Sequence, residues 1–256
     1  MNNLIAFIKK EMLEQTRSKR LMIVGLLFIF FGVMNPLTAK ITPMILEMLS
    51  ESMENSGIII TDVEVTALDS WMQYFKNLPT VLIAFILIES SIFAKEYQKG
   101  TLILVLSKGF KRYKIVISKL LVMIGIWTVG YLLYFIVTYA YTIYYWDNSI
   151  VSNLGFSVLI WWIFGILIIS IFMLFAVKFE NNGTTLALTA AVILPIYIIS
   201  LLPKMVKYLP INLTNGTSLV YGLEEVSYYI PSLIISLCLI VICIVFSIIT
   251  FNKKKL

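Results

Sequence analysis

The sequence predicts an all-α, polytopic membrane protein, and three observations indicate this fold class. Apolar residues make up 60% of the 256 residues and charged residues 13%, whereas ordinary globular proteins contain roughly 45–50% and about 25%. The apolar residues gather in six runs, each close to the roughly 20 helical residues that cross a bilayer. The runs are continuous and lack the alternation of a membrane β-strand. This composition argues against a soluble enzyme, a disordered chain and a disulfide-rich scaffold.

Six membrane-spanning helices and one interfacial helix are predicted. The six spans are residues 21–39, 78–94, 120–146, 154–177, 184–202 and 230–251. Residues 2–16 precede them and place Ile5, Ile8 and Met12 at helical spacing, with charged residues toward the other side. Such a pattern is typical of an amphipathic helix that lies in the membrane interface. The chain is therefore interpreted as a single transmembrane domain, residues 1–256.

The distribution of charge predicts the orientation of the bundle. Sixteen of the twenty lysines and arginines fall in residues 1–20, 95–119, 178–183 and 252–256, together with four acidic residues. The segments on the other side carry four basic and nine acidic residues. Because lysine and arginine accumulate on the cytoplasmic side, both termini are predicted to be cytoplasmic, in a multi-pass protein of the plasma membrane. The net charge of +6 then describes a face suited to anionic membrane lipids, and it calls for no nucleic-acid partner.

Two segments on the predicted outer side are long enough to carry structure. In the outer loop 40–77, Thr42 and Pro43 predict the start of a helix, with threonine as the cap and proline in the first turn. A row of glutamates follows at helical spacing and is interpreted as a solvated face rather than a cation site. The second segment, 203–229, is predicted to be either a surface loop or a partly re-entrant lid.

The predicted cytoplasmic loop 95–119 carries the strongest functional pattern. Gly100 is predicted to end one helix, and Thr101 to cap the start of the next. That next helix has a short apolar stripe at i, i+3 and i+4, with lysines around it. The members of the stripe are Leu102, Val105 and Leu106. A short amphipathic helix of this kind suits docking into a groove on another protein or lying on the lipid surface, and the pattern alone leaves both open.

This loop resembles the conserved cytoplasmic loop of ATP-binding-cassette permeases of the type-2 exporter class. In that family an acidic residue precedes Gly-Thr-Leu and then a Leu-Ser pair. The matching residues are Glu96, Gly100, Thr101, Leu102, Leu106 and Ser107. Lys119 matches the lysine that usually follows the loop, and residues 8–11 are similar to the start of such permeases. Gly109 is a departure, because many relatives carry proline there.

The resemblance implies a division of labour between subunits. The loop 95–119 would hold a coupling helix that seats on a separate cassette ATPase, and a second permease half, identical or different, would complete the translocation pathway. The coupling residues would be Glu96, Gly100, Thr101, Leu102, Val105, Leu106 and Ser107. ATP and magnesium would bind to the ATPase. The substrate stays open, although amphipathic peptides, lipids or hydrophobic antibiotics suit an apolar pathway better than ions.

The chain itself is predicted not to be an enzyme and to hold no cofactor or metal. It contains no G-x-x-x-x-G-K-[ST] phosphate loop, so it lacks this means of binding ATP. It also contains no histidine, which removes histidine-dependent acid–base and metal chemistry. The alternative functions are an ATP-independent secondary transporter and a membrane scaffold that recruits a soluble partner. A secondary transporter commonly has internal repeats and polar midplane groups, and neither is evident here.

Glu89 is the only charged residue within a predicted span. An ionisable side chain inside a membrane calls for a functional explanation by default. Glu89 lies five residues before the end of its span, from where it can reach the interface or pair with Lys95 or Lys99. Structural pairing is the favoured interpretation. A role in coupling or substrate passage, or in a proton relay, is the alternative.

Overall fold

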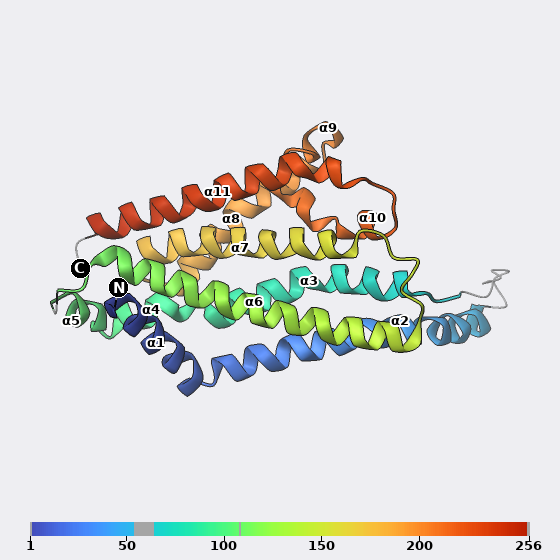
Figure 1. Cartoon of the computed structure of the whole chain (residues 1–256), viewed down its shortest axis with the longest axis horizontal. Helices are drawn as coiled ribbons and strands as arrows, with labels where there is room; N and C mark the ends of the chain where they lie inside the picture. Colours follow the sequence, from blue (N-terminus) through green and yellow to red (C-terminus); the bar gives the residue numbers. More distant parts are fainter. Residues whose placement is uncertain (1, 54–63, 108, 255–256) are drawn as a thin grey trace.

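Six long helical stretches form the membrane-spanning bundle in the computed structural model, which describes residues 2–53, 64–107 and 109–254 (Figure 1). They are α2 (Arg20–Met53), α3 with α4 (Ala67–Glu89 and Ser91–Gln98), α6 (Arg112–Tyr145), α7 (Leu154–Lys178), α8 (Asn182–Ser200) and α11 (Val226–Lys253). Each is long and apolar enough to cross a membrane. The described residues contain no strand. The predicted all-α fold with six spans is confirmed.

Helix α2 is longer than the predicted first span, 21–39. Its 34 residues correspond to about 51 Å at 1.5 Å per residue, so it extends well beyond a hydrocarbon core of about 30 Å. The predicted helix start at Thr42 and Pro43 is wrong. Pro43 lies inside α2, and the Thr42 hydroxyl donates to a carbonyl one turn earlier, at 2.8 Å, instead of capping a new helix. The part of the predicted outer loop at 54–63 lies outside the described residues.

The second and third spans also begin earlier than predicted. Helix α3 begins at Ala67 rather than at residue 78, because Thr66 and Asp69 form a capping box that starts it. Helix α6 begins at Arg112 rather than at residue 120, so the loop 95–119 contains the first two turns of this helix. Helices α7 and α8 begin and end within two residues of their predicted spans, and α11 begins four residues early.

Close packing of aromatic side chains against glycine holds the middle of the bundle together. Phe28, Phe85 and Trp127 come from α2, α3 and α6, and their ring centroids lie 5.4 to 6.4 Å apart. The Trp127 indole lies over Gly165 of α7, where an added Cβ would come within 2.3 Å of the ring. Lipid is as apolar as the side chains, so helices in a membrane associate through such close contacts. Glycine at position 165 therefore sets the separation of α6 and α7.

Buried amide and hydroxyl groups link α2, α3 and α6. Asn77 of α3 donates to the Asn35 side chain of α2 at 2.8 Å, and Asn35 donates to the Thr138 hydroxyl of α6 at 3.0 Å. Thr138 in turn donates to a carbonyl of α2 at 3.0 Å. Interhelical hydrogen bonds of this kind are worth about 0.6–2 kcal/mol each in a membrane. The chain of bonds fixes the register of the three helices.

The segment 203–229 is a compact cap at the end of the bundle opposite both termini (Figure 1). It contains α9 (Pro203–Val206), the short 3-10 helix η2 (Pro210–Thr214) and α10 (Gly216–Val220). Leu213 and Leu219 are fully buried, and the Trp161 indole donates to the Thr214 carbonyl at 2.8 Å. The segment therefore packs on the bundle and is not an extended surface loop.

Candidate functional site

The predicted coupling loop lies at the end of the bundle that holds both chain termini (Figure 1). At this end, which we call the basic end, α1 (Asn2–Arg17), α4 and α5 (Thr101–Ser107) meet the start of α6. Gly100 separates α4 from α5 with a φ of +63°, a left-handed conformation that favours glycine. Thr101 is the first residue of α5 rather than a cap, and its hydroxyl donates to the Glu96 carbonyl at 3.5 Å.

Helix α5 turns the predicted apolar stripe toward the protein. Leu102 is 1% exposed, and Val105 and Leu106 pack against the core of the bundle. Ile103 and Leu104, in contrast, are 54% and 63% exposed. Within this chain, the stripe predicted to face a partner thus lies against the bundle, with Leu102 buried and Val105 and Leu106 partly buried. The exposed apolar surface of α5 is the pair Ile103 and Leu104.

The turn after α5 explains the departure from the family pattern. Ser107 ends α5, and its hydroxyl donates to the Leu104 carbonyl at 3.0 Å. Gly109 has a φ of +79°, whereas the proline ring holds φ near −65°. Proline could not occupy this position without changing the backbone. Phe110 then packs on Phe7 of α1, with ring centroids 5.0 Å apart, so the turn contacts the interfacial helix.

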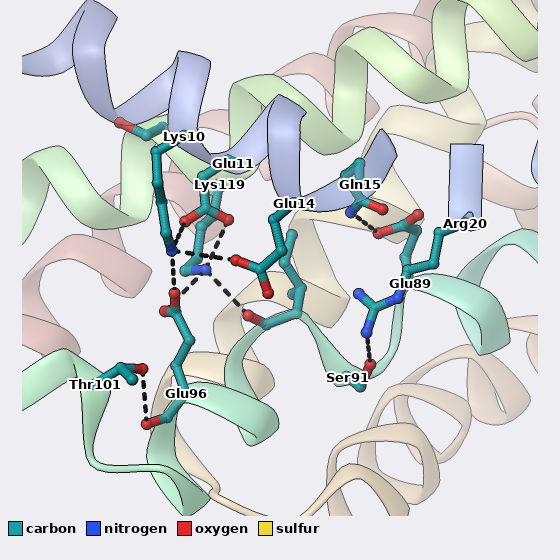
Figure 2. Close-up of polar contacts among 12 residues, drawn as sticks. Lys10, Glu11, Glu14, Gln15, Arg20, Glu89, Ser91, Glu96, Thr101 and Lys119 are labelled. Carbon is teal, nitrogen blue, oxygen red and sulfur yellow. Dashed lines mark hydrogen bonds and ion pairs between the residues drawn. The ribbon is translucent and has the colours of Figure 1, made fainter. Parts of the chain in front are cut away.

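Glu96 is buried in a group of ion pairs, which we call the ionic cluster (Figure 2). Its members are Lys10, Glu11, Glu14, Glu96 and Lys119. The Lys10 ammonium lies 2.6 Å from the Glu96 carboxylate and 2.9 Å from that of Glu11. The Lys119 ammonium lies 2.9 Å from each of the same two carboxylates. Three helices that are distant in sequence, α1, α4 and α6, are joined by these contacts.

Two lysines, Lys10 and Lys119, balance the charges of Glu11 and Glu96 in the ionic cluster. Lys119 is 1% exposed, Glu11 4% and Glu96 6%, while Lys10 and Glu14 lie at the exposed edge. A buried charge is tolerated only when it is paired and hydrogen-bonded. Burial by itself lowers the pKa of Lys10, but the hydrogen bond to Glu96 and the charge of Glu11 outweigh burial and raise this pKa above its ordinary value. Lys10 therefore stays cationic.

The same cluster brings three carboxylates close together. Oxygens of Glu11, Glu14 and Glu96 lie within 4.8 Å of one another, a separation that could hold a metal ion. The ammonium groups of Lys10 and Lys119 lie against these oxygens and supply the countercharge. The arrangement thus links three helices through ion pairs.

Glu89 makes a second link between α1 and the second span. It lies at the end of α3 and is fully buried. Among the described residues, the expected ion pair with Lys95 or Lys99 is not observed. Instead, Glu89 accepts a hydrogen bond from the Gln15 amide of α1 at 2.5 Å. Beside it, the Arg20 guanidinium donates to the Ser91 hydroxyl (Figure 2).

Helix α1 contributes functional residues that the sequence pattern did not reveal. Its buried face consists of Phe7, Glu11 and Gln15, while the predicted apolar residues Ile5 and Met12 are 58% and 39% exposed. Spacing of four places Phe7, Glu11 and Gln15 on one helix face. That spacing was the available signal, but two of the three are polar. The predicted apolar side, with Ile5, Ile8 and Met12, is the one expected to lie in the membrane interface, and the exposure of Ile5 and Met12 does not contradict that prediction.

Two comparisons with known proteins bear on this site. The family model described as "ABC-2 family transporter protein" matches residues 5–256. This range includes every residue of the ionic cluster and all of α5. No curated protein matches the sequence.

Proposed function

This chain belongs to the ABC-2 family of transporter proteins, and from that premise we propose that it is the permease subunit of an ATP-driven exporter, coupled through α5 to a separate cassette ATPase. Family membership and the six membrane-capable helices make it a multi-pass membrane protein with a permease role. One observation supports the proposed coupling to an ATPase through α5. The short helix α5 at the basic end exposes Ile103 and Leu104, and the helix before it, α4, is held by the ion pairs of Glu96.

In the proposed mechanism, the ionic cluster transmits movement of α5 to the spans. Glu96 lies on α4, one glycine-containing turn before α5, and its carboxylate contacts both Lys10 and Lys119. A partner that displaces α5 would therefore pull on α1 and α6 together. ATP and magnesium would bind to the partner ATPase, and its closure would tilt the spans and alternate access to the pathway.

A second permease half would supply the other wall of the pathway. Helix α8 buries only Thr185 and Thr189 within this chain, and α11 leaves apolar side chains such as Val241 and Phe246 exposed. These surfaces suit lipid or another half of the same kind. We propose a dimer of halves.

The proposed role of α5 in docking to the ATPase is tested by placing charged residues on its exposed face. The double variant Ile103→Asp and Leu104→Asp is expected to weaken association with the ATPase at least tenfold, about 1.4 kcal/mol, because an apolar contact would then have to bury two unpaired carboxylates. The measurement is co-purification with the cassette ATPase and stimulation of its ATP hydrolysis. Leu223→Asp is the matched control, since Leu223 is 77% exposed at the opposite end. Equal stimulation by both variants would refute the proposed docking site, and transport without any ATPase would favour a secondary transporter.

The proposed orientation places both termini in the cytoplasm and the cap 203–229 outside the plasma membrane, as the charge distribution favours. The test uses proteins in which Cys238 and Cys243 are replaced by alanine. We expect Ser149→Cys to react with a membrane-impermeant thiol reagent in intact cells, and Lys9→Cys to react only after the cells are opened. The reverse labelling pattern would invert the topology.

A further inference from the structure

A pocket of about 530 Å³ opens beside the ionic cluster, between α1, the start of α2 and α4. It is lined by Lys10, Leu13, Glu14, Arg17, Ser18, Arg20, Lys95 and Lys99. Small-molecule sites in proteins typically occupy about 300–1,000 Å³. The pocket is therefore large enough for a polar headgroup, and of its lining residues only Lys10 takes part in the mechanism proposed above.

Positive charge in this pocket exceeds negative charge by a wide margin. The only carboxylate in its lining, Glu14, is paired with Lys10 at 3.2 Å. The other four cations of the lining have no carboxylate ion pair among the described residues. They are Arg17, Arg20, Lys95 and Lys99. Lys95 also lies within electrostatic range of Arg20 and Lys99, which oppose its charge, and of Glu14, which favours it. Repulsion between cations this close together is reduced when an anion binds between them.

The pocket lies where apolar surface meets polar surface. Leu13, 48% exposed, forms part of its lining. On α2, Ile23 follows Arg20 by three residues, so it shares the same helix face, and it is 48% exposed. On α3, Leu87 precedes Ser91, the hydrogen-bond partner of Arg20, by four residues and is 54% exposed. Apolar surface for acyl chains thus leads away from the cations toward the membrane.

We propose that this pocket binds the phosphate group of an anionic phospholipid, with the acyl chains lying along Ile23 and Leu87. The guanidinium groups of Arg17 and Arg20 suit phosphate because their planar N–H donors match two of its oxygens at once. Lys95 and Lys99 add compact charge on the α4 side. A lipid is a better occupant than free phosphate because the apolar edge at Leu13 would face water if only the ion were bound.

Occupancy of the pocket would also strengthen the link between α1 and α4. The lipid phosphate would contact cations from both helices, and it would lie beside Lys10, whose ammonium already joins Glu11 to Glu96. Bound lipid would therefore hold the interfacial helix against the second span. The site is independent of the ATPase assignment, because it rests only on the lining and on the membrane position of α2 and α3.

The test is lipid binding to the purified full chain, measured by native mass spectrometry in detergent. Probes are phosphatidylglycerol, phosphatidylcholine, and inorganic phosphate added to the phosphatidylcholine sample. We expect one phosphatidylglycerol to bind in preference to phosphatidylcholine. The double variant Arg17→Gln and Lys99→Gln should lower the affinity for phosphatidylglycerol about 30-fold, at roughly 1 kcal/mol for each cation removed.

The matched control is Lys178→Gln with Lys253→Gln, which removes two cations from a different basic pocket at the same end. It should leave phosphatidylglycerol binding unchanged. Equal loss in both double variants would refute a specific site and leave only general attraction to a basic surface. Equal binding of phosphatidylcholine would refute recognition of an anion. Binding of inorganic phosphate as tight as that of the lipid would refute the lipid assignment. Lys95→Gln alone should lower the affinity for phosphatidylglycerol about fivefold. This variant tests the site with Arg17 and Lys99 left in place.

Discussion

Replacing Lys119 with methionine is expected to destabilise the protein by about 3–5 kcal/mol, the usual cost of removing one partner from a buried ion pair. The Lys119 ammonium contacts the carboxylates of Glu11 and Glu96 at 2.9 Å, and methionine has a similar shape without the charge. Only Lys10 would then remain near two buried carboxylates, and its side chain is 44% exposed. Repulsion between the carboxylates should drive α1 away from α4.

The stability of the Lys119 variant can be measured by reversible unfolding in mixed detergent micelles. Lys111→Met is the matched control, because Lys111 is an exposed lysine immediately before α6. Adding Glu96→Gln to Lys119→Met restores the charge balance and should recover at least 1 kcal/mol, as coupled neighbours do. A Lys119 variant as stable as the control would show that the ionic cluster does not hold the helices together.

The six spans could be predicted from the sequence because lipid leaves a spanning chain few choices. Backbone groups in hydrocarbon must be paired within a helix, so long apolar runs such as 154–177 translate directly into helices. The direction in which each apolar face points could not be predicted in the same way. Lipid and protein interior are both apolar, so hydrophobicity does not tell whether Leu102 or Leu104 faces the bundle. For this reason the sequence pattern did not show that α5 packs Leu102 against the bundle and exposes Leu104.

The candidate site was predictable where the backbone demanded a residue type and unpredictable where distant side chains meet. Gly100 was identified because a left-handed turn favours glycine. The partners of Glu96 could not be identified, because Lys10 lies 86 residues away in the chain and the pairing depends on how α1 packs. Glu11 and Lys119 are 108 residues apart. The resemblance placed Glu96 and Lys119 in one motif, but only the fold shows that they neutralise each other.

Glu89→Gln is expected to be at least as stable as the native protein, whereas Glu89→Ala should lose about 2–4 kcal/mol of unfolding free energy. Figure 2 shows the side-chain amide of Gln15 and the carboxyl group of Glu89 facing each other. One hydrogen bond joins them, and the amide oxygen of Gln15 and the other carboxyl oxygen of Glu89 have no hydrogen-bond partner among the described residues. Glutamine at position 89 brings an N–H that can satisfy the remaining oxygen of Gln15. Alanine leaves both groups of Gln15 unpaired in a buried site.

The two substitutions at position 89 distinguish a hydrogen-bonding role of Glu89 from a role that depends on its negative charge. If Glu89 contributes through its hydrogen bond to α1, glutamine preserves that contribution and alanine removes it. If Glu89 instead contributes as an anion near Arg20 and Lys119, which both face it electrostatically, glutamine should be as harmful as alanine. Thermal unfolding of the two variants in detergent distinguishes these cases, with Glu180→Gln as the control at an exposed carboxylate. Equal losses in both position-89 variants would contradict the hydrogen-bonded link and make Glu89 part of the electrostatic balance of the basic end.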